Sequence, residues 1–212
     1  MFEKSEKEFN VTETNLTFKT IYNKPYFPIN IPGIKKANVL LIPNEHLKSD
    51  IGITFPETTN DFLDFLQDKA DESFKPDIAV SDSDFKKYIM HSAEIQFATI
   101  ICKEFVLPII IGLITAFLYD RLKQSLKRAE ELTAEITIYV QNGQNKSLKL
   151  HYKGPISDFE NTLNNAAVSF FDETFELAKD GKGIKVRQSI TSNNNSVLPV
   201  TESDNNDGSS RN

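Results

Sequence analysis

Cysteine is nearly absent from this chain, and its scarcity excludes two kinds of stabilisation. The only cysteine among the 212 residues is Cys102. A single thiol cannot form an intramolecular disulfide or a zinc cluster of thiolates. A reducing compartment therefore fits the composition best.

The chain also lacks an excess of positive charge. Its 24 Lys and Arg residues are outnumbered by 30 Asp and Glu residues, which gives a formal net charge of -6. Because proteins bind nucleic acid largely by neutralising phosphates, this balance argues against a general nucleic-acid binder. A local basic patch is still compatible with it, but we expect no nucleic acid among the partners.

No motif of a well-marked enzyme class occurs in the sequence. It contains no GxSxG nucleophile elbow, no P-loop, no HExxH zinc motif and no dinucleotide fingerprint. We therefore expect a protein that is not an enzyme and that holds no cofactor.

Asp82 and Asp84 form the candidate metal site, because they flank one point of a loop that is expected to follow a buried strand. Open α/β sheets hold ligands at the carboxyl ends of strands, and Asp77, Glu45 or His46 could supply a third ligand. A simpler interpretation is that one aspartate caps the next helix and the other stabilises its first turn. The least favoured functional hypothesis, a metal-dependent hydrolase, rests on this site.

The longest hydrophobic run is shorter than a membrane crossing requires. It covers residues 105–119, FVLPIIIGLITAFLY, and carries no formal charge. A helix of this length extends about 22 Å, against about 30 Å for the hydrocarbon core of a bilayer. Extending the helix back to residue 95 supplies the length but includes Lys103 and Glu104, and a charge near the helix centre costs about 2.5 to 3.5 kcal/mol.

Two environments fit this run. Because apolar residues surround the helix, we expect it to be buried on every side, in lipid or in a large core or oligomer. Gly112 and Ala116 have the small-xxx-small spacing of closely packed helices. The residues expected to contact membrane or partner are Phe105, Ile109, Gly112, Ala116 and Leu118, and the basic flank that follows is Arg121, Lys123, Lys127 and Arg128.

The N-terminal segment offers no route across a membrane for the residues that precede the run. MFEKSEKEFN has no apolar core and is not a secretory signal. We therefore expect a membrane-associated protein with both flanking parts in the cytoplasm, whose helix spans the bilayer or lies shallow, tilted or re-entrant in it. The alternative is a soluble cytoplasmic protein.

The pattern of elements predicts an α+β fold. Residues 1–94 are expected to form a small α/β module, with ANVLLIP (37–43) as a strand covered on both faces, a helix over 60–70 and a second buried strand over 78–80, with a crossover that can be parallel. A further helix is expected to start at Ser83 or Asp84. It leads to the long hydrophobic helix and its basic end, residues 95–129.

A ββα module is expected over residues 134–179. Apolar and polar residues alternate over 134–140 and again over 147–152, on either side of an Asn-Gly turn, which is a strong signal for a hairpin. A following helix, capped by Ser157 or Asp158, can cover the hairpin with Phe159 and Leu163. Residues 180–212 are rich in Gly, Ser, Asn and Asp and are expected to be a disordered tail.

Several short elements resemble those of an uncharacterised bacterial protein family. They are NVLLIP (38–43), an FP loop (55–56), MHS (90–92), an apolar helix that ends in YDRLK (119–123) and YKGP (152–155). The layout is also similar to small effector-associated components of bacterial conflict, or anti-phage, systems. The resemblance implies an accessory or adaptor role in bacterial defence and carries no known reaction or catalytic residues.

The leading hypothesis is therefore a non-enzymatic accessory or adaptor protein that is membrane-associated or assembled through its apolar helix. Its expected partner is a membrane or a protein that contacts residues 95–119, and a homo-oligomer fits as well. The alternative is a soluble oligomeric interaction module whose apolar helix is buried between subunits.

Overall fold

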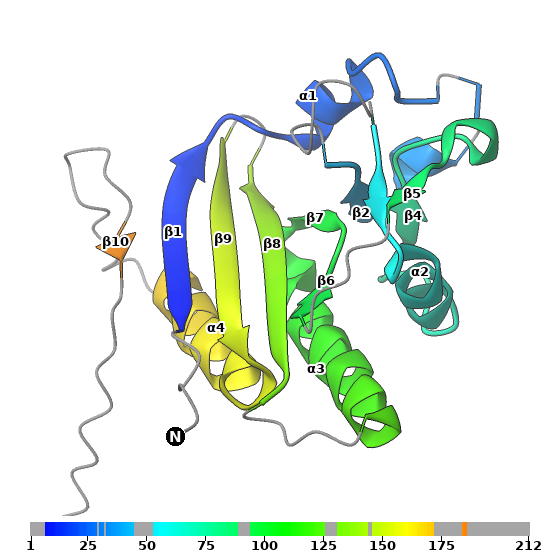
Figure 1. Cartoon of the computed structure of the whole chain (residues 1–212). Helices are drawn as coiled ribbons and strands as arrows, with labels where there is room; N and C mark the ends of the chain where they lie inside the picture. The colour runs from blue at the N-terminus through cyan, green and yellow to red at the C-terminus, as the bar shows by residue number, and fades with distance from the viewer. Residues whose placement is uncertain are drawn as a thin grey trace, which may run out of the picture.

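The computed structural model describes residues 7–28, 30–31, 33–44, 53–88, 94–125, 131–143, 146–171 and 184–185. Its fold is α+β, as predicted, with helices packed on a mixed β-sheet (Figure 1). Several predictions concern residues outside this part of the chain: they involve the MHS element, Lys127, Arg128 and all of the tail except residues 184–185.

The helices and strands follow in an order that begins and ends with strands. The strands are β1 (Glu8–Thr14), β2 (Val39–Ile42), β3 (Phe55–Pro56), β4 (Pro76–Ile78), β5 (Lys87–Tyr88), β6 (Glu94–Gln96), β7 (Thr99–Lys103), β8 (Thr133–Asn142), β9 (Lys146–Pro155) and β10 (Ile184–Lys185). The α-helices are α1 (Phe18–Tyr22), α2 (Thr59–Gln67), α3 (Leu107–Gln124) and α4 (Ile156–Phe171), and short 3-10 helices are η1 (Ile34–Lys36), η2 (Asp82–Asp84) and η3 (Glu104–Val106).

The main sheet has the strand order β10-β1-β9-β8-β7-β2-β4, and β6 pairs with β8 beside β7. The predicted hairpin is confirmed as β8 and β9, which pair antiparallel from Thr133↔Pro155 to Asn142↔Lys146. Gly143 of the Asn-Gly turn has a φ of 68°, which a residue without a Cβ adopts at little cost. Local sequence therefore determines this hairpin.

The predicted strand over 37–43 is confirmed as β2, and all four of its residues are buried. It lies between β7, to which it is antiparallel, and β4, to which it is parallel. The parallel crossover through α2 also agrees with the prediction. The second buried strand, predicted over residues 78–80, is β4, which begins two residues earlier, at Pro76.

β1 comes from the first residues of the chain but pairs with β9, which lies near its other end. The two strands match in antiparallel register from Glu8↔Lys153 to Thr14↔Ser147. Strands from the predicted N-terminal and C-terminal modules therefore share one sheet. The division of the chain into separate domains stays a prediction.

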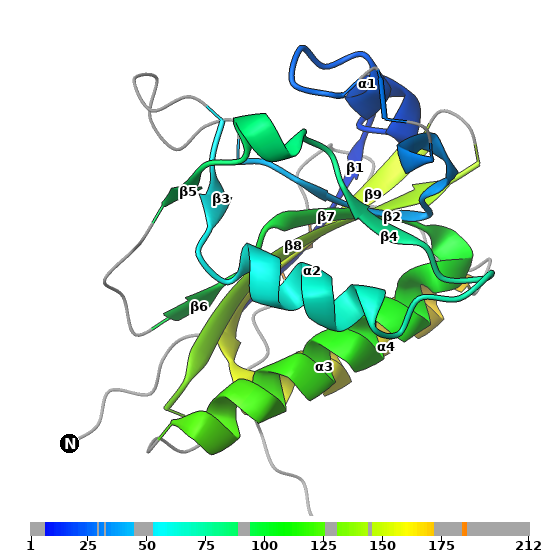
Figure 2. The ribbon, with the colours of Figure 1, turned by 90° about the vertical axis from the view of Figure 1, so that its right-hand side faces the viewer.

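Helices α2, α3 and α4 pack on one face of the sheet, and α1 lies on the other face (Figure 2). The helix-covered face takes the apolar side of the hairpin strands, which includes Ile136, Ile138, Leu150 and Tyr152. α4 covers the hairpin as predicted, with the Phe159 and Tyr152 rings 5.3 Å apart. This face holds the larger of the two apolar clusters.

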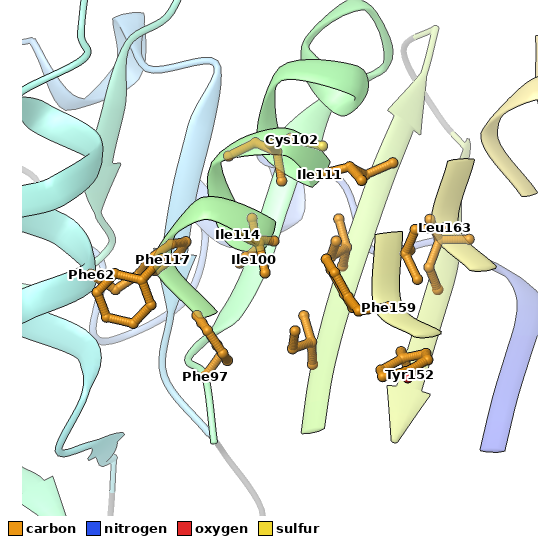
Figure 3. Close-up of a cluster of buried hydrophobic side chains, with 14 of the residues drawn as sticks. Phe62, Phe97, Ile100, Cys102, Ile111, Ile114, Phe117, Tyr152, Phe159 and Leu163 are labelled. Atoms are coloured by element: carbon orange, nitrogen blue, oxygen red, sulfur yellow. The ribbon is translucent and has the colours of Figure 1, made fainter. Parts of the chain in front are cut away.

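Three phenylalanines join α2 and α3 to the sheet (Figure 3). Phe62 of α2 lies 5.0 Å from Phe97 and 5.1 Å from Phe117 of α3, measured between ring centroids. Phe97 and Phe117 are 5.7 Å apart. Since Phe97 lies between β6 and β7, this cluster fixes the two helices against one end of the strands.

The long helix starts later than predicted. It begins at Leu107, after η3, whereas residues 94–96 and 99–103 are strands that pair in parallel with β8. A short continuous apolar run has no periodicity to separate strand from helix, and the β-branched residues Thr99, Ile100 and Ile101 favour the strand. Cys102 lies in β7, where burial raises the pKa of its thiol to about 12.

The helix predicted from Ser83 or Asp84 is also wrong. Asp82–Asp84 form one 3-10 turn, and Lys87–Tyr88 form β5, which pairs in parallel with β3. Phe85 stacks on Phe55 with ring centroids 5.0 Å apart. A contact between distant segments thus overrides the local helical pattern.

Candidate functional site

An apolar stripe runs along the side of η3 and α3 that faces away from the sheet. We call Phe105, Ile109, Gly112, Ala116 and Tyr119 the outer face of α3. Phe105 is 66% exposed, and Ile109 and Tyr119 are each 41% exposed. Only one other large apolar side chain in the described chain is comparably exposed, so this stripe is the main apolar surface there.

The positions of the outer face repeat with spacings of four and three residues. Such spacing places side chains in one seam along a helix, as in coiled coils. Four of the five predicted contact residues lie in this seam, and Tyr119 extends it. Leu118 does not belong to it, because its side chain is fully buried in the core.

The opposite side of α3 supplies the packing that holds the helix on the sheet. Its fully buried residues are Leu107, Ile110, Ile111, Ile114 and Leu118. The helix therefore has apolar residues on all sides, as predicted, but one side is already covered by the protein itself.

Gly112 has no role in the packing that the structure describes. A Cβ built on this residue would meet nothing within 4 Å. Glycine in a helix interior costs about 1 kcal/mol relative to alanine. The fold therefore gives no reason for glycine at this position, whereas close approach of a second helix would.

The helices on either side of α3 have polar outer surfaces. On α2 the exposed residues include Asp61 and Asp64, with Asp68 at its C-cap, and on α4 they include Glu160 and Asn164. The apolar stripe is thus bordered by acidic residues on one side and polar residues on the other, which is the pattern of a docking surface with a polar rim.

The described part of the predicted basic flank is paired with carboxylates. Arg121 forms an ion pair with Asp61, and its guanidinium lies 5.0 Å from the centre of the Phe117 ring. Lys123 Nζ lies 2.9 Å from Asp120 Oδ1. These pairs reduce the net positive charge that the flank would present to an anionic membrane.

Glu104–Gln124 is a helical segment long and apolar enough to cross a membrane by length and composition, the one such segment in the described chain. Of its most apolar portion, 39% is buried inside the protein. A core helix of a soluble protein has the same length and composition, so this property fits both predicted environments.

The predicted metal site is only partly within the described chain. Asp82 and Asp84 lie in η2 and are exposed, and burial is the main cause that raises the pKa of Asp77. In the described residues no group of three His, Cys, Asp or Glu side chains is placed to hold a metal ion. Since Glu45 and His46 lie outside those residues, the metal site stays a prediction.

A basic cleft lies at the end of the sheet where β2 and β4 begin, and sequence reasoning missed it. Its volume is about 600 Å³, and it is lined by five lysines together with aromatic and amide side chains. The lysines are Lys19, Lys35, Lys36, Lys75 and Lys103. Because they come from four separate segments, only one adjacent pair stands out in the sequence.

No protein-family model, no curated protein and no solved structure matches this chain. Proposals about its function therefore rest on the geometry of the outer face of α3 and of the basic cleft.

Proposed function

We propose that this protein is a non-enzymatic accessory or adaptor protein that assembles through the outer face of α3, with a second copy of the chain as its partner. The observation that carries the proposal is the combination of Gly112, which the described packing does not require, with exposed large apolar side chains on both sides of it. Small residues between large ones let two helices approach closely and interdigitate.

The outer face is self-complementary about Gly112. Most homodimers have two-fold symmetry, in which one patch meets its own copy. If two α3 helices cross antiparallel at Gly112, Phe105 of one meets Tyr119 of the other and Ile109 meets the small Ala116. Each helix then places its positive N-terminal end beside the negative C-terminal end of the other.

The ends of the outer face carry charges of both signs. Lys123 follows Tyr119 in the seam, and its side chain is 77% exposed. Lys123 is paired with Asp120, and in the register that aligns Phe105 with Tyr119 both residues lie near Glu104 of the partner. A protein partner is favoured over an anionic membrane, because Asp64 and Asp68, exposed on the neighbouring α2 and directly after it, would be repelled by anionic headgroups.

The experiment is sedimentation equilibrium of the wild-type chain and of Gly112→Leu. We expect a concentration-dependent dimer for the wild type and at least about tenfold weaker association for the variant, which corresponds to about 1.4 kcal/mol. Gly112→Leu should not unfold the monomer, because the site is open and leucine is the better helix former. Thermal unfolding monitored by circular dichroism checks this point.

Asn164→Leu is the matched control, since it adds the same side chain to the exposed surface of α4. It should leave the association unchanged. A wild-type chain that stays monomeric at all concentrations, or a Gly112→Leu variant that associates normally, would contradict the proposal.

Membrane association is the second candidate, supported by the length and composition of Glu104–Gln124. A full crossing would remove α3 from the sheet and uncover the apolar face of β7 and β8, so a shallow placement through the outer face is the version to test. Carbonate extraction of cell membranes distinguishes the two candidates. Release into the supernatant together with dimer formation favours the dimer, and retention in the membrane favours the embedded helix.

The accessory role in bacterial defence, which rests on the resemblance of short elements, belongs to the same proposal. It predicts that the gene lies beside genes for an effector. A survey of gene neighbours checks this role independently of the state of assembly.

A further inference from the structure

The basic cleft is formed by five segments that are distant in sequence. α1 and η1 contribute one part of its lining, and the residues just before β2 and β4 contribute another, with Lys103 at the end of β7, Phe105 in η3 and Gln141 in β8. Figure 2 shows α1 on one face of the sheet above the region where β2 and β4 lie side by side. The cleft is therefore at an end of the sheet, open to solvent.

The charge of the cleft is opposite to that of the whole protein. Five lysines line it against one acidic residue, Glu72, although the chain as a whole has a net charge of -6. Within the described residues, none of these lysines forms an ion pair with a carboxylate. Cations that are held near one another and outnumber the carboxylates beside them attract anions, and lysine is a common ligand for phosphate.

Hydrogen bonds of two side-chain amides, those of Asn38 and Gln141, hold the segments that line the cleft in place. Asn38 donates a hydrogen bond from Nδ2 to the Ser73 carbonyl at 2.6 Å and accepts one at Oδ1 from the Lys75 backbone N–H at 2.8 Å. These bonds hold the segment that carries Lys75 against the start of β2. The position of Lys75 is therefore set before any ligand binds.

Hydrogen bonds of Gln141 hold α1 in place in a similar way. Its Oε1 accepts a hydrogen bond from the Phe18 backbone N–H at 2.8 Å, and its Nε2 donates one to the Gly143 carbonyl at 2.7 Å. Gln141 is buried, so these bonds are shielded from water. They connect the start of α1 to the turn of the β8–β9 hairpin and place Lys19 and Tyr22 at the cleft.

Aromatic rings lie beside the ammonium groups. Lys103 Nζ is 4.6 Å from the centre of the Phe18 ring, and Lys35 Nζ is 5.9 Å from that of Tyr22. Phe105 also lines the cleft and is 66% exposed. Aromatic side chains that line a cleft beside cations suit a ligand that combines phosphate groups with a flat ring, because bases stack on aromatic side chains.

We propose that this cleft is a binding site for a small ligand that carries two or more phosphate groups, of which a nucleoside triphosphate is the representative probe. The volume of about 600 Å³ lies within the range for small-molecule sites. The lysines bind the phosphates, and Tyr22, which does not belong to the outer face of α3, provides stacking surface for the ring. The proposal requires no catalytic step.

The test is isothermal titration calorimetry of the full chain with ATP, with inorganic triphosphate and with AMP. We expect ATP and triphosphate to bind and AMP to bind at least about tenfold more weakly, because it carries fewer charges for the lysines. Raising the salt concentration should weaken the binding of ATP. Flotation with phosphatidylserine vesicles determines whether a lipid headgroup is an additional source of the phosphate.

Lys36→Glu combined with Lys75→Glu is the test variant, and we expect it to weaken ATP binding at least about tenfold. Lys86→Glu combined with Lys87→Glu is the matched control, because it reverses two exposed charges and changes the net charge equally. Neither lysine lines the cleft, and Figure 2 shows β5, which contains Lys87, to the left of α1, β2 and β4. The control should bind ATP as the wild type does.

Three results would overturn the proposal: no binding of ATP or of triphosphate, equal weakening by the control variant, or equal affinity for AMP and ATP. The variants leave Gly112 and the rest of the outer face of α3 unchanged. A failure of this proposal is therefore separate from a failure of self-association, which Gly112→Leu tests.

Discussion

His151 lies on the part of the sheet that α1 does not cover, among charges of both signs. Its Nδ1 is 3.0 Å from Thr137 Oγ1, and its Nε2 is 4.0 Å from Glu135 Oε1. Burial lowers the pKa of His151 more than the charges of Glu135 and Glu8 raise it. The neutral imidazole is therefore favoured in the folded protein.

This shift predicts a loss of stability on mild acidification. An unfolded histidine has a pKa of about 6.5, so below that pH the unfolded chain takes up a proton more readily than the folded one. The contribution of His151 to the free energy of unfolding is thus zero at high pH and becomes unfavourable as the pH falls from about 6.5 towards the lower folded pKa. Urea denaturation at several pH values between about 5 and 8 measures it.

His151→Gln is the comparison, because glutamine can bond to Thr137 but does not titrate. Its stability should depend less steeply on pH in the same range. Equal slopes for the wild type and the variant would assign the pH dependence to other groups.

Lys149, His151 and Lys153 alternate along β9 and share one surface of the sheet. This surface is not strongly basic, because Lys153 is paired with carboxylates. Lys153 Nζ lies 3.2 Å from Glu94 and 3.4 Å from Glu135. Neither carboxylate is adjacent to it in the sequence. The sequence shows the three basic residues on one face, but only the pairing of β6, β8 and β9 brings the acidic ones beside them.

At the scale of single elements, one side of α3 packs in the core and the other side is exposed. Phe117 points into the aromatic cluster with Phe62 and Phe97 (Figure 3) and is 5% exposed, whereas Tyr119 is 41% exposed on the outer face. Two aromatic residues separated by one position thus belong to the core and to the proposed interface.

Alanine substitutions distinguish the contribution of the buried side to monomer stability from that of the exposed side to self-association. Phe117→Ala should lower the free energy of unfolding by about 3 to 5 kcal/mol, because it leaves a cavity between α2 and α3. Tyr119→Ala should change monomer stability by less than about 0.5 kcal/mol and weaken self-association. Urea denaturation and sedimentation equilibrium measure the two effects, and a large loss of monomer stability in Tyr119→Ala would show that the outer face supports the fold itself.

The hydrophobic run alone predicted Phe105, Ile109, Gly112 and Ala116 as contact residues, because they belong to an uncharged stretch with helical spacing, and all four are exposed in the structure. It could not separate them from Leu118, since a helix that is apolar all round has no marked side. The structure distinguishes them, because Leu118 packs in the core against the sheet and is buried, whereas the other four residues are exposed. The lysines of the basic cleft gave no comparable signal, because the fold collects them from distant segments.

At the scale of the whole molecule, the N-terminal part depends on the C-terminal part for its hydrogen bonds. β1 pairs with β9 over seven register positions, and β2 pairs with β7 over four. Phe9 and Val11 of β1 are buried in the same core as residues of β8, β9 and α4.

We therefore expect that residues 1–94 do not fold alone. Without β7 and β9, β1 and β2 lose their antiparallel partners and the core loses α3 and α4, so too little apolar surface is buried to offset the chain entropy. Circular dichroism and the dispersion of amide NMR signals check this expectation on the fragment, with the full chain as control. A cooperatively folded fragment would instead support the division into domains at residue 94.

Local sequence accounts for the hairpin with its Asn-Gly turn, the buried strand β2, the two helices with clear apolar faces and the apolar character of residues 105–119. Tertiary structure decided that residues 99–103 are a strand, because β8 and β2 pair with it on both sides. It also decided which side of α3 remains exposed and where five lysines meet. These features depend on contacts between distant segments, and periodicity along the chain does not encode such contacts.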